Sequence, residues 1–205
     1  EVGRGAFAGP LYVGGVIFAP TMNNKPFDSR SSLRASERIK YLESLGIDDS
    51  KKLKPNERKT LAKVIQKESL AYHISAINVA QINRIGVGKA TFCAMRDVVR
   101  NLRNRTSNDK IFVLVDGFYV KYLKGIGLKN QKGIIHGDGI SLSIAAARII
   151  AKVARDKHMR KLSAKFPAYG WGRNKGYGTN FHRQALSNFG PTPLHRTAFI
   201  ETFVI

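Results

Sequence analysis

The fold prediction starts from one stretch of the sequence, Ile111-Phe112-Val113-Leu114-Val115-Asp116-Gly117. Five apolar residues run without a break into an aspartate and a glycine, a pattern typical of a strand that is covered on both faces and ends in a turn. An acid at that point lies at the carboxyl end of a sheet strand, where open α/β folds place their functional sites. Asp116 is therefore the first candidate for chemistry.

Helical and strand patterns alternate on both sides of this stretch. The sequence predicts strands over 11–19, 71–78 and 133–137, and a strand-like run at the C-terminal tail. It predicts helices over 37–45, 53–69, 88–103, 141–162 and 179–188, with a polar loop over 20–36. Helices that alternate with strands indicate a three-layer α/β domain.

Charge is the strongest feature of the composition. The 205 residues carry 35 Lys and Arg against 14 Asp and Glu, a net charge of +21. A folded chain this basic is expected to bind a polyanion, nucleic acid first of all, and the alternative is a solvated basic surface without a dedicated partner. The single cysteine, Cys93, excludes an internal disulfide framework and fits a reducing compartment. No apolar run is long enough to span a membrane.

Three acids stand apart from the others, most of which lie beside basic residues on predicted surfaces. Asp116 ends the apolar strand, Asp138 lies between two glycines just before a long helix, and Glu1 opens a glycine-rich segment. If such carboxylates converge, a cation must offset their repulsion, and oxygen ligands favour Mg²⁺ or Mn²⁺. Two such ions support phosphodiester displacement. Alternatively, Asp138 caps the following helix and Asp116 makes a turn.

The segment 166–177 interleaves aromatic residues with glycine and basic residues. This composition suits stacking on a base or a sugar. A buried aromatic loop with solvated Arg173 and Lys175 is an equally good interpretation. A phosphate-binding loop at 86–91 is excluded, because the glycine that it requires would fall at Asn83.

Ordered motifs run along essentially the whole chain. They are Glu1-Val2-Gly3-Arg4-Gly5, Ala8-Gly9-Pro10, Asp49-Ser50-Lys51-Lys52-Leu53, Leu114-Val115-Asp116-Gly117, Gly137-Asp138, Ser143-Ile144-Ala145-Ala146, Ala151-Lys152-Val153-Ala154-Arg155-Asp156, Lys175-Gly176-Tyr177 and Gly190-Pro191-Thr192-Pro193-Leu194-His195-Arg196. Together these motifs resemble those of the bacterial type 2 ribonucleases H (ribonuclease HII). The resemblance implies a ribonuclease H-like fold with a mixed five-stranded sheet flanked by helices. It also implies a catalytic domain over 1–160 and a C-terminal helical extension over 161–205.

The resemblance further implies an endoribonuclease. Such enzymes cut the RNA strand of RNA–DNA hybrids and single ribonucleotides embedded in duplex DNA, on the 5′ side of the ribonucleotide, leaving 3′-hydroxyl and 5′-phosphate ends. Four carboxylates in the order Asp, Glu, Asp, Asp hold Mg²⁺ or Mn²⁺. Glu1, Asp116 and Asp138 match the second, third and fourth. The first would directly precede Glu1, so we expect this sequence to begin inside the motif.

The resemblance assigns substrate contacts as well. Gly3, Arg4 and Gly5 match the stretch that senses the 2′-hydroxyl at the RNA–DNA junction, which is the group that separates RNA from DNA. Tyr177 matches the tyrosine that packs against the deoxynucleotide after the ribose. Ser50 and Lys51 match a phosphate-contacting stretch. Arg148 departs from the pattern, since a serine usually stands there.

We therefore expect a cytoplasmic, monomeric, metal-dependent endoribonuclease with no membrane association. Two rival hypotheses remain at this point. One is a non-catalytic basic protein that binds RNA–DNA hybrids or structured RNA on the same fold. The other is a nuclease or recombinase of the same fold that acts on DNA.

Overall fold

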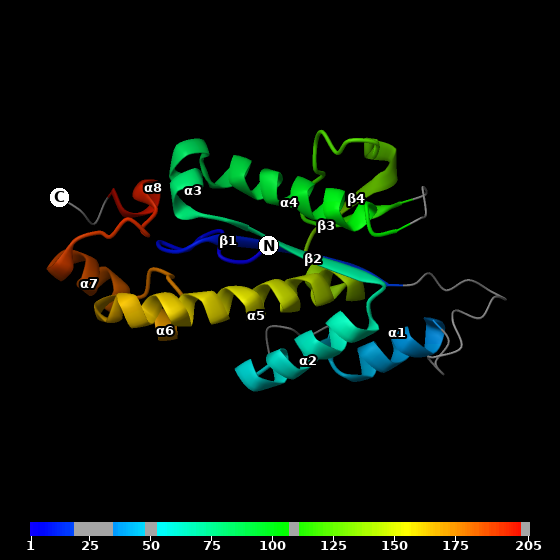
Figure 1. Cartoon of the computed structure of the whole chain (residues 1–205), viewed down its shortest axis with the longest axis horizontal. Helices are drawn as coiled ribbons and strands as arrows, with labels where there is room; N and C mark the ends of the chain where they lie inside the picture. Colours follow the sequence, from blue (N-terminus) through cyan, green and yellow to red (C-terminus); the bar gives the residue numbers. More distant parts are fainter. Residues whose placement is uncertain (19–34, 48–52, 107–110, 202–205) are drawn as a thin grey trace. The chain divides into compact units, whose positions relative to one another are not determined.

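The computed structural model describes residues 1–18, 35–47, 53–106 and 111–201 (Figure 1). Its contacts divide the chain into two compact units. Unit 1 comprises Glu1–Val13, Ile74–Asp97 and Ala151–Ile205, and unit 2 comprises Gly14–His73 and Val98–Ile150. Each unit thus combines segments that are distant in the sequence. The predicted domain boundary at residue 160 falls inside a continuous helix, so that boundary stays a prediction.

The strands and helices follow one another along the chain largely in the predicted order. The described strands are β1 (Leu11–Ile17), β2 (Ala71–Ile77), β3 (Val113–Asp116) and β4 (Gln131–Ile134). The α-helices of the described segments are α1 (Ala35–Ser44), α2 (Pro55–Glu68), α3 (Val79–Ile85), α4 (Val87–Arg103), α5 (Leu142–Lys165), α6 (Trp171–Asn174), α7 (Asn180–Phe189) and α8 (Thr197–Ile200). Short 3-10 turns lie at Leu128–Asn130, Gly137–Gly139 and Pro167–Tyr169.

The α/β class is confirmed, whereas the strands pair less extensively than expected. Within the described ranges β1 pairs with β2 and β3 pairs in parallel with β4, two ladders in place of one five-stranded sheet. β3 is also covered on only one face: Val115 is buried, but Phe112 is 57% and Leu114 39% exposed. The prediction that both faces of this strand are covered is therefore wrong, because hydrophobicity alone does not show which face is packed.

Two terminal features of the predicted elements differ from the structure. The sequence predicts a strand through Asn78, but Asn78 instead caps helix α3, its side chain accepting a hydrogen bond from the Gln81 backbone N–H at 2.8 Å. The C-terminal tail, predicted to be strand-like, contains the helical turn α8. Asn83 of α3 holds this turn, because its side-chain oxygen accepts from the Thr197 N–H at 3.2 Å and its amide donates to the His195 carbonyl at 3.2 Å.

The predicted apolar stripe of α5 is confirmed. Ala145, Ala146, Ile149 and Ile150 are all at most 1% exposed. In unit 2, Gly15 of β1 lets the strand pack closely against α4, because a Cβ at this position would lie 2.4 Å from the Val98 side chain. Among the described helices, none has the length and hydropathy needed to cross a membrane.

Candidate active site

Asp116 lies at the carboxyl end of the β3–β4 ladder. The parallel register pairs Asp116 with Ile134, and the Gly117 N–H donates to the Ile134 carbonyl at 2.8 Å. A Cβ at Gly133 would lie 2.5 Å from the Gly117 carbonyl oxygen, so the close approach of the two strands requires glycine there. Both strands therefore end at one edge, as predicted for a site beyond the carboxyl ends of strands.

Asp138 reaches the same edge through a tight turn after β4. His136 adopts a left-handed conformation with φ 54°, which reverses the chain into the 3-10 turn at Gly137–Gly139. The Gly137 N–H donates to Asp116 Oδ1 at 3.1 Å. A side chain at residue 137 would require the Ile144 side chain to shift, because its Cδ1 atom is 2.6 Å from the ideal Cβ position. Two of the three predicted acids, Asp116 and Asp138, therefore lie on segments that are hydrogen-bonded to each other.

The Asp138 carboxylate is buried and forms an ion pair. Asp138 is 6% exposed, and its Oδ2 atom accepts a hydrogen bond from the Arg148 guanidinium of α5. The pair provides the countercharge that a buried carboxylate requires. Arg148 was noted in the sequence only as a departure from the family pattern. Its ten-residue separation from Asp138 gave no signal of this contact, because the intervening turn sets the geometry.

Glu1 belongs to unit 1, next to the Val2–Tyr12 bridge, and is half-buried. Within the described ranges no group of three or more His, Cys, Asp or Glu side chains is arranged to hold a metal ion. Asp116 and Asp138 nevertheless offer hard oxygen donors of the kind that Mg²⁺ and Mn²⁺ prefer. These two residues fit such an ion chemically, and the contribution of Glu1 stays a prediction.

The predicted substrate-sensing residues form a tight turn in unit 1, the glycine turn (residues 3–6). The Ala6 N–H donates to the Gly3 carbonyl at 3.4 Å, and Gly3 has φ +86°. Arg4 and Gly5 are exposed at its tip, whereas Gly3 and Ala6 are buried. The turn therefore presents its tip outward and anchors its ends in the protein.

Two fully buried arginines brace the segment that carries the glycine turn. Arg196 donates to the Gly9 carbonyl from Nε at 3.0 Å and from one terminal nitrogen at 2.8 Å. Its other terminal nitrogen donates to the Arg4 carbonyl at 2.8 Å. Arg155 donates to the carbonyls of Pro10 at 2.9 Å and Ala8 at 3.3 Å. Burial lowers the pKa of Arg155, and it lowers the pKa of Arg196 to about 10, so Arg196 remains charged at neutral pH.

Gly3→Ala should unfold the glycine turn locally. A Cβ on Gly3 would lie 2.1 Å from Arg155 Nε, and an L-residue is strained at φ +86°. We expect a loss of at least about 2 kcal/mol of unfolding free energy in urea titration. Gly5→Ala is the matched control for stability, because nothing lies within 4 Å of its ideal Cβ position. Equal stability of the two variants would contradict this packing.

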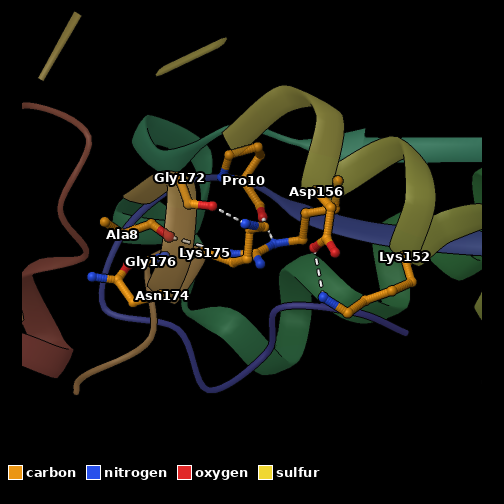
Figure 2. A network of polar contacts seen from close by, with 9 residues as sticks. Ala8, Pro10, Lys152, Asp156, Gly172, Asn174, Lys175 and Gly176 are labelled. Carbon is orange, nitrogen blue, oxygen red and sulfur yellow. Dashed lines mark hydrogen bonds and ion pairs between the residues drawn. The ribbon is translucent and has the colours of Figure 1, made fainter. Parts of the chain in front are cut away.

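Tyr177 follows a strained segment that closes over the same N-terminal residues. The Asn174 side chain accepts from the Gly176 N–H at 2.8 Å, and Lys175 Nζ donates to the Gly172 carbonyl (Figure 2). The Gly176 carbonyl accepts from the Phe7 N–H at 2.8 Å. The half-buried Tyr177 ring lies 5.4 Å from the Arg155 guanidinium carbon. Tyr177 and the glycine turn therefore share one arginine as support.

A buried histidine pair fixes the Tyr177 backbone. The Thr192 N–H donates to His195 Nδ1 at 2.8 Å, so in the neutral ring Nε2 carries the proton and donates to His182 Nε2 at 3.1 Å. Trp171 Nε1 donates to the same His182 atom at 3.1 Å. His182 Nδ1 then donates to the Tyr177 carbonyl at 3.0 Å. This arrangement satisfies both rings only when both are neutral.

The histidine pair predicts acid sensitivity. Burial, and then the charge of His182, lowers the pKa of His195 to about 4, and burial lowers the pKa of His182. The unfolded chain therefore binds protons first, and stability that is complete above pH 6.5 falls as the pH drops toward 4. We expect a loss of about 2 kcal/mol from His195 between pH 7.5 and 5, measured by urea titration. The exposed His136→Asn variant should show the same slope, and a flat profile would contradict the neutral pair.

Two predicted phosphate contacts, Ser50 and Lys51, lie outside the described residues. The supports of the site, by contrast, were missed from the sequence. Arg155 and Arg196 stood inside matching motifs without an assigned role, and the spacing of the histidines suggested no shared function. The interleaving of aromatic and basic residues over 166–177 was the only signal, and it left the buried and the substrate-facing interpretations equal.

The family model and the related proteins that match this chain carry the same description. The family model described as "Ribonuclease HII" matches residues 31–202. The chain is 36% identical over 204 residues to ribonuclease HII of Caldicellulosiruptor bescii, covering 100% of this chain and 85% of that protein. It is 40% identical over 202 residues to ribonuclease HII of Mycobacterium avium, covering 98% and 76%.

Solved structures have the same fold. In the PCNA:RNase HII complex from Archaeoglobus fulgidus, the matched chain is 21% identical with a TM-score of 0.71, over 97% of this chain and 90% of that one. The ribonuclease H2 of Pyrococcus horikoshii is 24% identical with a TM-score of 0.65, over 99% and 95%. Bst-RNase HIII in complex with Mn²⁺ is 18% identical with a TM-score of 0.71, over 96% and 63%.

Proposed function

Because the chain belongs to the ribonuclease HII family and is a metal-dependent endoribonuclease acting on RNA–DNA hybrids, we propose that it also cuts single ribonucleotides embedded in duplex DNA. Cleavage falls on the 5′ side of the ribonucleotide and leaves 3′-hydroxyl and 5′-phosphate ends. The proposal rests on family membership and on the hydrogen bond that ties Gly137, and hence Asp138, to Asp116.

The carboxylates have one task in this reaction. Asp116, Asp138 and Glu1 would supply carboxylate oxygens to Mg²⁺ or Mn²⁺ in the loaded enzyme. Bound divalent ions activate water and stabilise the leaving 3′ oxygen. The fixed geometry of the β3–β4 edge keeps Asp116 oriented, because Gly137 N–H occupies one of its oxygens and leaves the other for a ligand.

The glycine turn has a different task, which is to select the ribose. Arg4 and Gly5 are exposed at the tip of this turn, and the glycine lets the backbone approach a sugar closely and bond its 2′-hydroxyl. Tyr177 packs against the following deoxynucleotide, and Ser50 and Lys51 contact phosphates. The net charge of +21 supplies binding to the duplex without sequence preference.

A panel of labelled duplexes tests the substrate class. We expect cleavage of an RNA–DNA hybrid and of a DNA duplex with one ribonucleotide, in Mg²⁺ or Mn²⁺, and none of the same duplex made wholly of DNA. Binding to all three without cleavage would favour a non-catalytic binding protein. Cutting of the all-DNA duplex would favour a DNA nuclease on the same fold.

The remaining assignments follow from this function. We infer that the protein acts as a monomer and that 1–160 form the catalytic domain, with 161–205 as an extension that carries Tyr177. We also infer a cytoplasmic location, because the relatives that the chain matches come from bacteria, whose DNA lies in the cytoplasm. Sedimentation at micromolar concentration tests the monomer, and a dimer would contradict it.

A further inference from the structure

The ion pair between Arg148 and Asp138 joins a partly exposed cationic side chain to a candidate metal ligand. The Asp138 side chain is 8% exposed and that of Arg148 is 33% exposed. The guanidinium bonds Asp138 Oδ2. The carboxylate is therefore fixed within the protein, while part of the arginine already faces solvent.

A buried carboxylate requires a countercharge, and a guanidinium and a divalent cation can both supply it. We propose that Arg148 is an internal counter-cation of Asp138, which holds this carboxylate in the metal-free protein and must be displaced when a divalent cation binds. The inference rests on the proposed function, because it takes Asp138 as a metal ligand.

Displacement is sterically feasible for this side chain. Arg148 lies on α5 near its N-terminal end, and its partial exposure gives the guanidinium a path to water. Arginine also keeps its charge at every physiological pH, so the competition does not depend on protonation. The consequence is a lower affinity for the cation than the carboxylates alone would give.

Arg148→Ser tests the competition without any measurement of activity. Titration calorimetry of the substrate-free protein should show Mn²⁺ binding about tenfold tighter than in the wild type, the range expected for a partly exposed charge pair. The Tm of the metal-free variant should fall, because Asp138 loses its ion pair with Arg148. The rise in Tm on adding Mn²⁺ should grow. Arg148→Lys retains a competing charge and should bind Mn²⁺ close to the wild-type value.

Matched controls separate the possible outcomes. Arg100→Ser removes one exposed arginine from α4 and should leave the Mn²⁺ affinity unchanged. An equal gain in that variant would reduce the effect to net charge and overturn the inference. Asp138→Asn should weaken Mn²⁺ binding strongly. If it does so while Arg148→Ser binds no more tightly than the wild type, the role of Arg148 is wrong. If Asp138→Asn has no effect, the proposed metal site itself is wrong.

Discussion

Asp116→Asn is expected to slow cleavage of a single-ribonucleotide duplex by about a thousandfold or more. An amide keeps the shape of the side chain and can still accept the 3.1 Å hydrogen bond from the Gly137 N–H. It loses the negative charge that holds a divalent cation. Single-turnover cleavage in Mg²⁺ measures the loss, and a gel-shift titration of the same duplex should show unchanged binding.

The control for Asp116→Asn is Asp97→Asn. Asp97 lies on α4 and has no assigned role in the reaction. The control variant should cut at the wild-type rate and bind the duplex equally well. Turnover by Asp116→Asn within tenfold of the wild type would remove Asp116 from the metal site.

Arg196→Ala should be the most destabilising substitution among the site supports. The change deletes three hydrogen bonds to the carbonyls of Gly9 and Arg4 and leaves a cavity beneath the glycine turn. Buried acceptors without partners and a lost large side chain together cost about 3 kcal/mol or more. Urea titration followed by tryptophan fluorescence reports the loss directly, because Trp171 is fully buried in the same unit.

Arg196→Lys shows whether stability depends on the planar arrangement of the three guanidinium hydrogen bonds. Lysine keeps the charge but cannot reproduce three donors in one plane, so we expect most of the loss to remain. Arg173→Ala, on an exposed arginine of the same unit, should change stability by less than about 0.5 kcal/mol. Recovery of wild-type stability by Arg196→Lys would show that charge alone is needed at this position.

Local patterns predicted the main elements but not the supports of the site. The apolar run into Asp116 correctly placed that acid at the end of a strand, and the stripe that includes Ala145 and Ile149 correctly predicted the buried face of α5. One signal is an unbroken apolar run and the other a helical period, and each lies within a single element. The burial of Arg155 and Arg196 has no such signal, because it depends on carbonyls of the N-terminal segment turning inward. Sequence rules treat arginine as solvated, and these two are not.

The ion pair between Asp138 and Arg148 could not be predicted from the sequence either. Asp138 was predicted as a ligand or a helix cap, and neither interpretation included Arg148. The contact exists because the left-handed turn at His136 and the 3-10 turn after it aim the carboxylate at α5. Backbone turns of this kind bring residues into contact whose spacing in the sequence gives no sign of that contact.

The position of the cut in a DNA duplex with one ribonucleotide decides whether the protein has the proposed activity. With either strand end labelled and Mg²⁺ or Mn²⁺ present, we expect a single break on the 5′ side of the ribonucleotide. The upstream fragment should carry a 3′-hydroxyl that a polymerase can extend. A break on the 3′ side, an end that cannot be extended, or an intact duplex would contradict the account.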